Sequence, residues 1–181
     1  VATLRASRLQ ATGNWTAAET LSNAGKAVST PGLAMNAAGQ TMVVWAEAQN
    51  QGPAIVYARQ ASAGGAWGPV TATGSYTGGG SISMDDAGNV AMLSSLNNGT
   101  ATDLYASYYQ AGGGWGAPNL LEQAPGNVTA ARLSTGAWGD TVVLWTQSDG
   151  TRNNLWAARR AIPDASVPAN AAPTASAGGA Q

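Results

Sequence analysis

The sequence contains no histidine, no cysteine and no phenylalanine, and only one lysine among its 181 residues. Without histidine and cysteine, the chain cannot form a zinc site of the usual kind, a haem–histidine bond, a reactive thiol or a serine–histidine catalytic pair. Charged residues make up 9% of the chain and the formal net charge is −1, so there is no basic patch to bind nucleic acid. No apolar run reaches the roughly 18 residues of a membrane-spanning helix, so we expect no membrane span.

What the sequence does contain is a long internal repeat. An aliphatic residue is followed six positions later by glycine in three segments, Leu33–Gly39, Ile82–Gly88 and Leu133–Gly139, whose glycines are 49 and 51 residues apart. Each glycine leads into an apolar run and then into a segment with alanine at a fixed place: Val56-Tyr57-Ala58, Leu104-Tyr105-Ala106 and Leu155-Trp156-Ala157. A glycine-rich tip that carries tryptophan also recurs, at Trp15, Trp67 and Trp115. Several features that recur with about the same spacing in three successive segments indicate a repeat architecture.

Each repeat predicts four short antiparallel strands, because its apolar runs are rich in Val, Leu, Trp and Tyr and are bounded by Gly, Asn, Asp and Pro. The second run is apolar at nearly every position, which is typical of a strand buried on both faces. We therefore predict an all-β fold of about three four-stranded β-propeller blades over residues 1–161.

The strands predicted along the chain are the last two of one blade, two whole blades and three of a fourth. A propeller needs at least about four blades to close. We therefore expect an incomplete propeller, whose missing strands or blades come from another chain, from a second copy or from other parts of a longer protein. Residues 162–181 are rich in alanine and proline and are predicted to be a linker.

The repeat resembles the blades of secreted bacterial sialidase-like propeller proteins. The resemblance rests on the Asp-box-like turn Ser83–Gly88, on Val56-Tyr57-Ala58-Arg59 and on the tip Gly64-Gly65-Ala66-Trp67-Gly68. It implies a secreted or cell-surface bacterial protein. The segment Pro173–Gly179 also resembles the start of a polycystic-kidney-disease-type (PKD) module, which is common in bacterial surface proteins.

Sialidases bind the carboxylate of their substrate with three arginines and use a Tyr–Glu pair as the nucleophile. Here Arg8, Arg59 and Arg159 recur on the third strand of separate repeats, so we expect them to lie apart. The glutamates have no tyrosine beside them in sequence; they are Glu19, Glu47 and Glu122. We therefore predict no catalytic residues in this chain.

Aromatic residues are the main candidates for a binding site. Trp45 and Trp145 lie on the apolar strands and are predicted core residues, while the tip tryptophans Trp15, Trp67 and Trp115 are expected to pack between sheets. Trp138 occupies a turn position that holds alanine in the sister repeats, which favours an exposed contact with a ligand. The other candidate ligand contacts depart from the repeat or lie in a glycine-rich loop or on the third strand; they are Tyr76, Tyr108, Tyr109 and Arg59.

One turn carries oxygen-bearing side chains. Asp85, Asp86 and Asn89 could supply ligands to Ca²⁺, which prefers carboxylate and carbonyl oxygens. The alternative is that these side chains stabilise the turn through hydrogen bonds to their own backbone. We expect no other cofactor.

Three functions remain open. The first is a non-catalytic binding or structural module, with a protein or a glycan as its ligand. The second is the carbohydrate-binding propeller of a sialidase-like glycoside hydrolase whose catalytic residues lie outside this chain. The third is a self-assembling repeat element of a surface layer or filament.

Overall fold

The computed structural model describes residues 2–76, 78–122, 124 and 126–161. Fourteen strands and no helix occur in this part of the chain, which confirms the predicted all-β class. Accordingly, no helix in these residues could span a membrane. The predicted linker and PKD-type segment, residues 162–181, lie outside the described residues.

The strands form four antiparallel sheets in chain order. The first sheet pairs β1 (Arg5–Ala6) with β2 (Glu19–Thr20). The second has the order β3 (Val28–Met35), β4 (Thr41–Glu47), β5 (Ala54–Ala61) and β6 (Thr71–Tyr76). The third contains β7 (Gly78–Met84), β8 (Val90–Asn97) and β9 (Thr102–Gln110), with β10 (Gly114–Trp115) and β11 (Asn119–Leu120) both paired with β9. The fourth has β12 (Val128–Thr135), β13 (Thr141–Ser148) and β14 (Asn153–Arg160).

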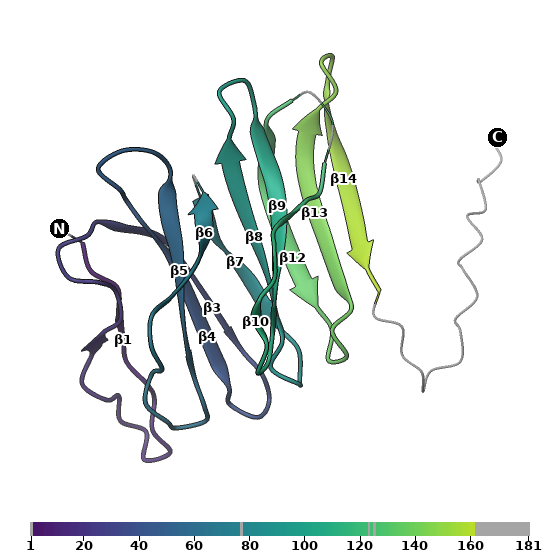
Figure 1. The fold of residues 1–181 in the computed structure, drawn as a ribbon. Helices are drawn as coiled ribbons and strands as arrows, with labels where there is room; N and C mark the ends of the chain where they lie inside the picture. The colour runs from purple at the N-terminus through teal and green to yellow at the C-terminus, as the bar shows by residue number, and fades with distance from the viewer. Residues whose placement is uncertain (1, 77, 123, 125, 162–181) are drawn as a thin grey trace, which may run out of the picture.

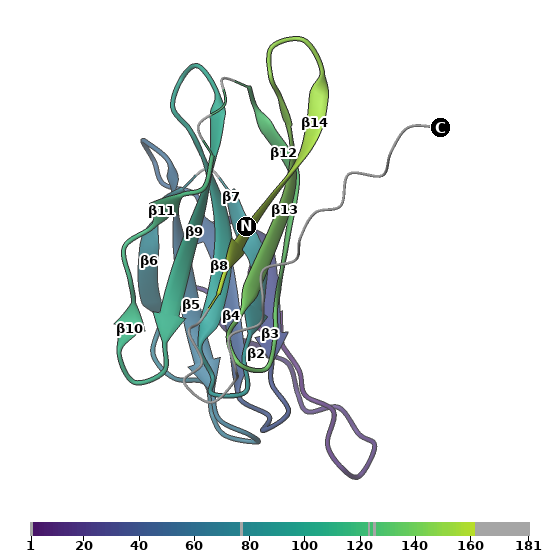
Figure 2. The same cartoon turned by 90° about the vertical axis from the view of Figure 1, so that its right-hand side faces the viewer.

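The sheets stand side by side from the N-terminal to the C-terminal end (Figure 1), and the view turned by 90° shows them one behind another (Figure 2). The first strand of the third sheet, β7, contacts the first strands of the second and fourth sheets, β3 and β12. Glycine permits this approach, since a Cβ atom on Gly32 of β3 would overlap the backbone carbonyl oxygen of Gly80 in β7. The described residues thus form a fan of sheets that meet at one edge, and they do not form a closed ring.

Each of these three inner strands contains a register shift at the same repeat position. The shifts lie between Ser29 and Gly32, between Gly79 and Ser81, and between Thr129 and Arg132. Within the shifted segments, Thr30 and Ala130 adopt positive φ angles of 48° and 49°. A β-bulge bends its strand and increases the local twist, so the inner edge of each sheet is shaped in the same way.

The strand register also shows which side chains of a sheet face the following sheet and which face the preceding one. Here the trailing face of a sheet is the one whose side chains point toward the following sheet, and the leading face is the opposite one. The trailing side chains Met42, Val44 and Val56 of the second sheet pack with Val90 and Met92 of the third in one core cluster. In the same way, the third and fourth sheets share a second cluster, which contains Leu93, Leu104, Ala106, Val143 and Trp145. Apolar side chains on both faces of β4 and β8 are therefore explained by sheets on both sides.

The predicted core tryptophans are confirmed, with Trp45 0% and Trp145 3% exposed. Each indole N–H also has a partner two residues along its strand. Trp45 Nε1 donates to Glu47 Oε1 at 2.7 Å, and Trp145 Nε1 donates to Gln147 Oε1 at 3.1 Å. Buried indoles need such partners, so a Trp-x-Glu/Gln pattern stabilises two of the four sheets.

The tip tryptophans behave differently from one another. Trp67 and Trp115 pack partly against core clusters between sheets, as expected. Trp15 is 67% exposed, so the prediction that it packs between sheets is wrong. The reason is positional: Trp67 and Trp115 each have an earlier sheet to pack against, whereas Trp15 belongs to the first sheet.

Candidate functional site

The β3–β4, β7–β8 and β12–β13 turns lie at one end of the sheets. The C-terminal ends of β5, β9 and β14 lie at the same end. The register pairs Thr41 with Ala61, Val90 with Tyr109 and Thr141 with Arg160, so β5, β9 and β14 finish where β4, β8 and β13 begin. We call this end of the sheets, with the β3–β4, β7–β8 and β12–β13 turns, the turn end.

Hydrogen bonds join the three turns. Asn36 Nδ2 in the first of them donates to the carbonyl oxygens of Asp85 and Asp86 in the second, at 3.2 and 3.3 Å. The backbone N–H of Asp86 then donates to the carbonyl oxygen of Ala137 in the third turn, at 3.1 Å. A surface built on these turns is therefore held by the scaffold itself.

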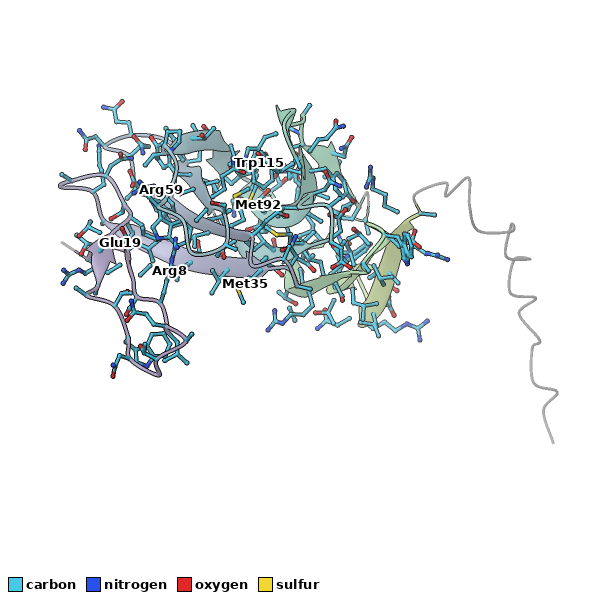
Figure 3. The ribbon with its side chains drawn as sticks, turned by 90° about the horizontal axis from the view of Figure 1, so that it is seen from below. Arg8, Glu19, Met35, Arg59, Met92 and Trp115 are labelled. Atoms are coloured by element: carbon cyan, nitrogen blue, oxygen red, sulfur yellow. The ribbon has the colours of Figure 1, made fainter. Side chains whose placement is uncertain are left out.

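An aromatic pair lies at the turn end between the second and third sheets. Trp115 pairs with Tyr109 across β10 and β9, and the two rings are tilted at 57° with centroids 5.5 Å apart. The Tyr109 hydroxyl reaches across to β5 and donates to Gln60 Oε1 at 2.7 Å. Seen from below, Trp115 lies on the opposite side of the sheets from Met35 of the inner strand β3 (Figure 3).

Three open hollows surround this pair. Two, of about 360 and 370 Å³, lie between the second and third sheets, and one of about 490 Å³ lies between the third and fourth. Tyr109 lines all three hollows, Trp115 lines the first and the last, and Gln60 lines the first two. We call these hollows, with Gln60, Tyr109 and Trp115, the turn-end groove.

Tyr108 faces the other way on β9, because neighbouring residues of a strand point to opposite faces. It borders the largest hollow, and the Arg160 guanidinium lies over its ring at 4.4 Å from the ring centre. Burial raises the pKa of the Tyr108 hydroxyl, and the Arg160 charge partly opposes this rise. Tyr108 therefore stays neutral at physiological pH, and its ring contacts the guanidinium of Arg160 from the same chain.

Of the other candidate ligand contacts, Arg59 shares one hollow with this pair, whereas Trp138 and Tyr76 line none of the three. Trp138 is 73% exposed on the β12–β13 turn, which agrees with its predicted exposure. Tyr76 is only 3% exposed and packs in the core between the second and third sheets, so the prediction that it contacts a ligand is corrected. Arg59 lines one hollow, but its guanidinium donates to the carbonyl oxygens of Gly68 and Trp67, at 2.7 and 3.2 Å. It therefore holds the loop before β6.

The proposed calcium ligands form a turn-stabilising set. Asp85 is buried, and its two carboxylate oxygens accept from the backbone N–H and the side-chain amide of Asn89, both at 2.8 Å. Asp86 is exposed on the same turn. Within residues 2–76, 78–122, 124 and 126–161, no three His, Cys, Asp or Glu side chains are grouped so that they could hold a metal ion. These contacts favour the turn-stabilising alternative for Asp85 and Asn89.

The groove offers aromatic faces, amide groups and backbone, and little charge. Hydrolysis of a glycosidic bond uses two carboxyl groups about 5–9.5 Å apart. Of the described residues that line the three hollows, Asp85 is the single carboxylate, and both its oxygens are bound to Asn89. The described lining of the groove therefore lacks such a pair of carboxyl groups.

Two residues of the groove region were not singled out from the sequence. Gln60 and Arg160 each complete an aromatic contact made by another sheet, with Tyr109 and Tyr108 respectively. A contact between sheets depends on how the sheets are rotated about each other, and no local pattern in the sequence reports that angle. Trp115 was noticed, but as a packing residue alone.

No protein-family model matches the sequence, and no curated protein matches it. Among solved structures, the crystal structure of an endo-arabinase from Bacteroides thetaiotaomicron VPI-5482 is similar, with a TM-score of 0.51 and 13% sequence identity. The similarity covers 86% of this chain and 64% of that chain, so this chain spans less than two thirds of the arabinase structure. At this identity the likeness concerns the fold alone: both are all-β, and the neighbour is propeller-like.

Proposed function

We propose that this chain is a non-catalytic, carbohydrate-binding segment of a β-propeller, and that the turn-end groove receives the sugar. The observation that carries the proposal is the Tyr109–Trp115 pair beside Gln60 in one open groove. The apolar C–H face of a sugar ring can pack on an aromatic ring, while its hydroxyls exchange hydrogen bonds with amides and backbone groups. A pocket that joins apolar walls to a few fixed polar groups is the usual form of a small-ligand site.

In this proposal the four sheets are successive blades, with β3, β7 and β12 as their innermost strands. Contacts among these strands, and the bulge that each contains, support this arrangement. The propeller-like neighbour supports the same class, and it is by name an enzyme that acts on a carbohydrate. The protein to which the segment belongs is proposed to be a secreted or cell-surface bacterial protein.

The carboxylates near the sheets support a non-catalytic role. Asp85, in the groove, is held in a turn by Asn89, and Glu47, which lies outside the groove at the other end of β4, is buried and accepts the indole N–H of Trp45. Neither is free to act as a paired acid and base. If the intact protein is a sialidase-like hydrolase, its catalytic residues belong to other parts of that protein, and this segment positions the glycan.

A glycan array that contains arabinan fragments and sialylated oligosaccharides tests the proposal. The wild-type chain should bind a defined set of glycans, and Trp115→Ala should lose that binding because one wall of the groove is removed. Trp138→Ala is the matched control, since it removes an exposed tryptophan at the same end and should leave binding unchanged. Thermal melting of both variants shows whether Trp115→Ala keeps its fold, and Gln60→Ala, which changes an exposed side chain, should weaken the same binding.

Three results would contradict the proposal. The first is the absence of binding to any glycan, and the second is binding that survives Trp115→Ala and Gln60→Ala. The third is binding that is lost only in Trp138→Ala, which would place the ligand at the turn tip. A preference for sialylated glycans that depends on Trp115 would favour the sialidase-like alternative over an arabinan-directed one.

A further inference from the structure

The turn-end groove crosses two junctions between sheets, and the same cross-sheet contact recurs at both. Tyr109 and Arg160 hold the same repeat position in β9 and β14, since each pairs with the first residue of the strand before it. Gln60 and Tyr108 lie one position earlier in β5 and β9. Tyr109 contacts Gln60 of the preceding sheet, and Arg160 contacts Tyr108 of the preceding sheet. The two junctions are therefore equivalent places, with an amide and a hydroxyl at the first and a cation at the second.

Arg160 gives the largest hollow a positive charge that a ligand can contact. Its guanidinium lies 4.4 Å from the centre of the Tyr108 ring, and it forms no ion pair or hydrogen bond with the residues that the structure describes. A ring face attracts a cation, but it offers no oxygen to the N–H donors of a guanidinium. The carboxylate in this hollow, Asp85, is 2% exposed, and both its oxygens accept from Asn89. The donors of Arg160 are therefore available for an acidic group of the ligand.

Two other arginines near this end are not available in the same way. Arg59 also lines a hollow, but its guanidinium donates to carbonyl oxygens of the loop before β6. Arg159 points to the opposite face of β14 from Arg160, and its guanidinium lies 3.5 Å from the Asp140 carboxylate. Arg159 lines none of the three hollows, so it offers a control substitution of the same type one residue away.

The groove has room for a ligand of several units. Each of its three hollows, of about 360, 370 and 490 Å³, falls within the roughly 300–1,000 Å³ of a small-ligand pocket. Tyr109 lines all three hollows, and Trp115 lines hollows on both sides of the third sheet. A ligand bound at Arg160 can therefore continue along the aromatic pair into the junction between the second and third sheets.

We propose that this groove binds a segment of a polysaccharide that contains uronic acid, and that Arg160 binds the carboxylate of one uronate unit. The inference rests on the proposed carbohydrate-binding function and names the class of sugar. A guanidinium and a carboxylate can form two parallel N–H···O hydrogen bonds, which is the strong form of this contact. In a uronate the carboxylate replaces the exocyclic CH₂OH group of a hexose. The ring therefore keeps the C–H face and the hydroxyls that Trp115, Tyr109 and Gln60 would contact.

Isothermal titration calorimetry with trigalacturonate and its methyl ester tests the inference, because esterification removes the charge of the carboxyl groups. The wild type should bind trigalacturonate at least about tenfold more tightly than the ester, as expected for a charge-assisted hydrogen bond. Arg160→Gln should bind both ligands as weakly as the wild type binds the ester. Arg159→Gln is the matched control and should keep the preference. Added salt should weaken the binding of trigalacturonate and leave that of the ester unchanged, because salt screens the attraction between charges.

Each other outcome overturns the inference. Equal binding of the two ligands by the wild type, or a preference that survives Arg160→Gln, overturns it while the proposed carbohydrate-binding function stands. A preference that is lost in both variants does the same, since it would depend on the general charge of this end. Tighter Arg160-dependent binding of sialylated oligosaccharides than of trigalacturonate overturns the choice of uronate. The absence of binding to any glycan overturns the proposed function as well. Both arginines are exposed, so thermal melting should show the wild-type fold in both variants.

Discussion

Replacing Trp45 tests whether the sheets are held together as described. Trp45 is 0% exposed, stacks on Tyr57 with ring centroids 6.1 Å apart and packs against Leu21 of the N-terminal segment. Truncating a buried tryptophan to alanine costs about 3–5 kcal/mol through lost contacts and the cavity that remains. The change also removes the N–H that donates to Glu47, and losing a hydrogen bond to a buried polar group costs about 1–3 kcal/mol more.

The expected total for Trp45→Ala, about 4–8 kcal/mol, is comparable with the whole stability of a marginal domain. Urea unfolding followed by circular dichroism measures it. Trp45→Phe keeps an aromatic ring but removes the indole donor and part of the indole volume, so it should cost less than Trp45→Ala and at least the about 1–3 kcal/mol of the lost hydrogen bond. Trp138→Ala, at a 73% exposed side chain, should stay within about 0.5 kcal/mol of the wild type. A Trp45→Ala variant no less stable than Trp138→Ala would refute the reasoning.

Two further predictions concern the inner edge and an outer hairpin. Gly32→Ala should lower the free energy of unfolding by about 1–3 kcal/mol, because the new Cβ would overlap the Gly80 carbonyl oxygen. Gly136→Ala is the control in the same urea experiment. Its new Cβ would lie 3.8 Å from the nearest atom, so the free energy of unfolding should change little. Hydrogen bonds from Thr151, first from its hydroxyl, lower the pKa of Asp149 below its usual 3.8. The stabilisation from Asp149 should therefore be complete above pH 3.8 and be lost only as the pH falls through the lower folded-state pKa; a carboxyl NMR titration that gives an ordinary pKa would contradict this.

Much of the fold could be predicted from the spacing of the repeated features in the sequence. The spacing of Gly39, Gly88 and Gly139 places three equivalent turns, and the structure has a β-turn connection between the first two strands of a sheet at each of them. Runs that are apolar at every position predict strands covered on both sides; β4 and β8 confirm this, whereas Val142 and Leu144 leave one face of β13 exposed. These features depend on local sequence and on burial, and both can be read from residue order.

Other features depend on geometry that residue order does not report. Arg59 and Arg159 both lie near the end of a third strand, yet Arg59 pairs with Val43 and Arg159 with Val142, as the aligned alanines Ala58 and Ala157 also imply. They differ by one register position and point to opposite faces of their sheets. The inner bulges were also not predicted, because Thr30 and Ala130 are ordinary residues whose positive φ angles are imposed by the sheet around them.

The candidate site was predicted in part. Tyr108 and Tyr109 were selected because they break the repeat, and both line hollows at the turn end. Tyr76 was selected for its glycine-rich surroundings, but β6 lies beside the third sheet and the Tyr76 ring is buried there. A glycine-rich segment is as typical of close packing between strands as of an open loop, and the sequence does not distinguish the two.

The indole N–H signals of an NMR spectrum test the central claim most directly, because each of the seven tryptophans gives one signal. The ¹⁵N-labelled chain is titrated with a glycan selected on the array, and the signals are assigned by single substitutions. We expect the Trp115 signal to shift with saturation, while the signals of the buried Trp45 and Trp145 and of the exposed Trp138 stay in place. A Trp115 signal that does not move, or a shift confined to Trp138, would contradict a binding site in the turn-end groove.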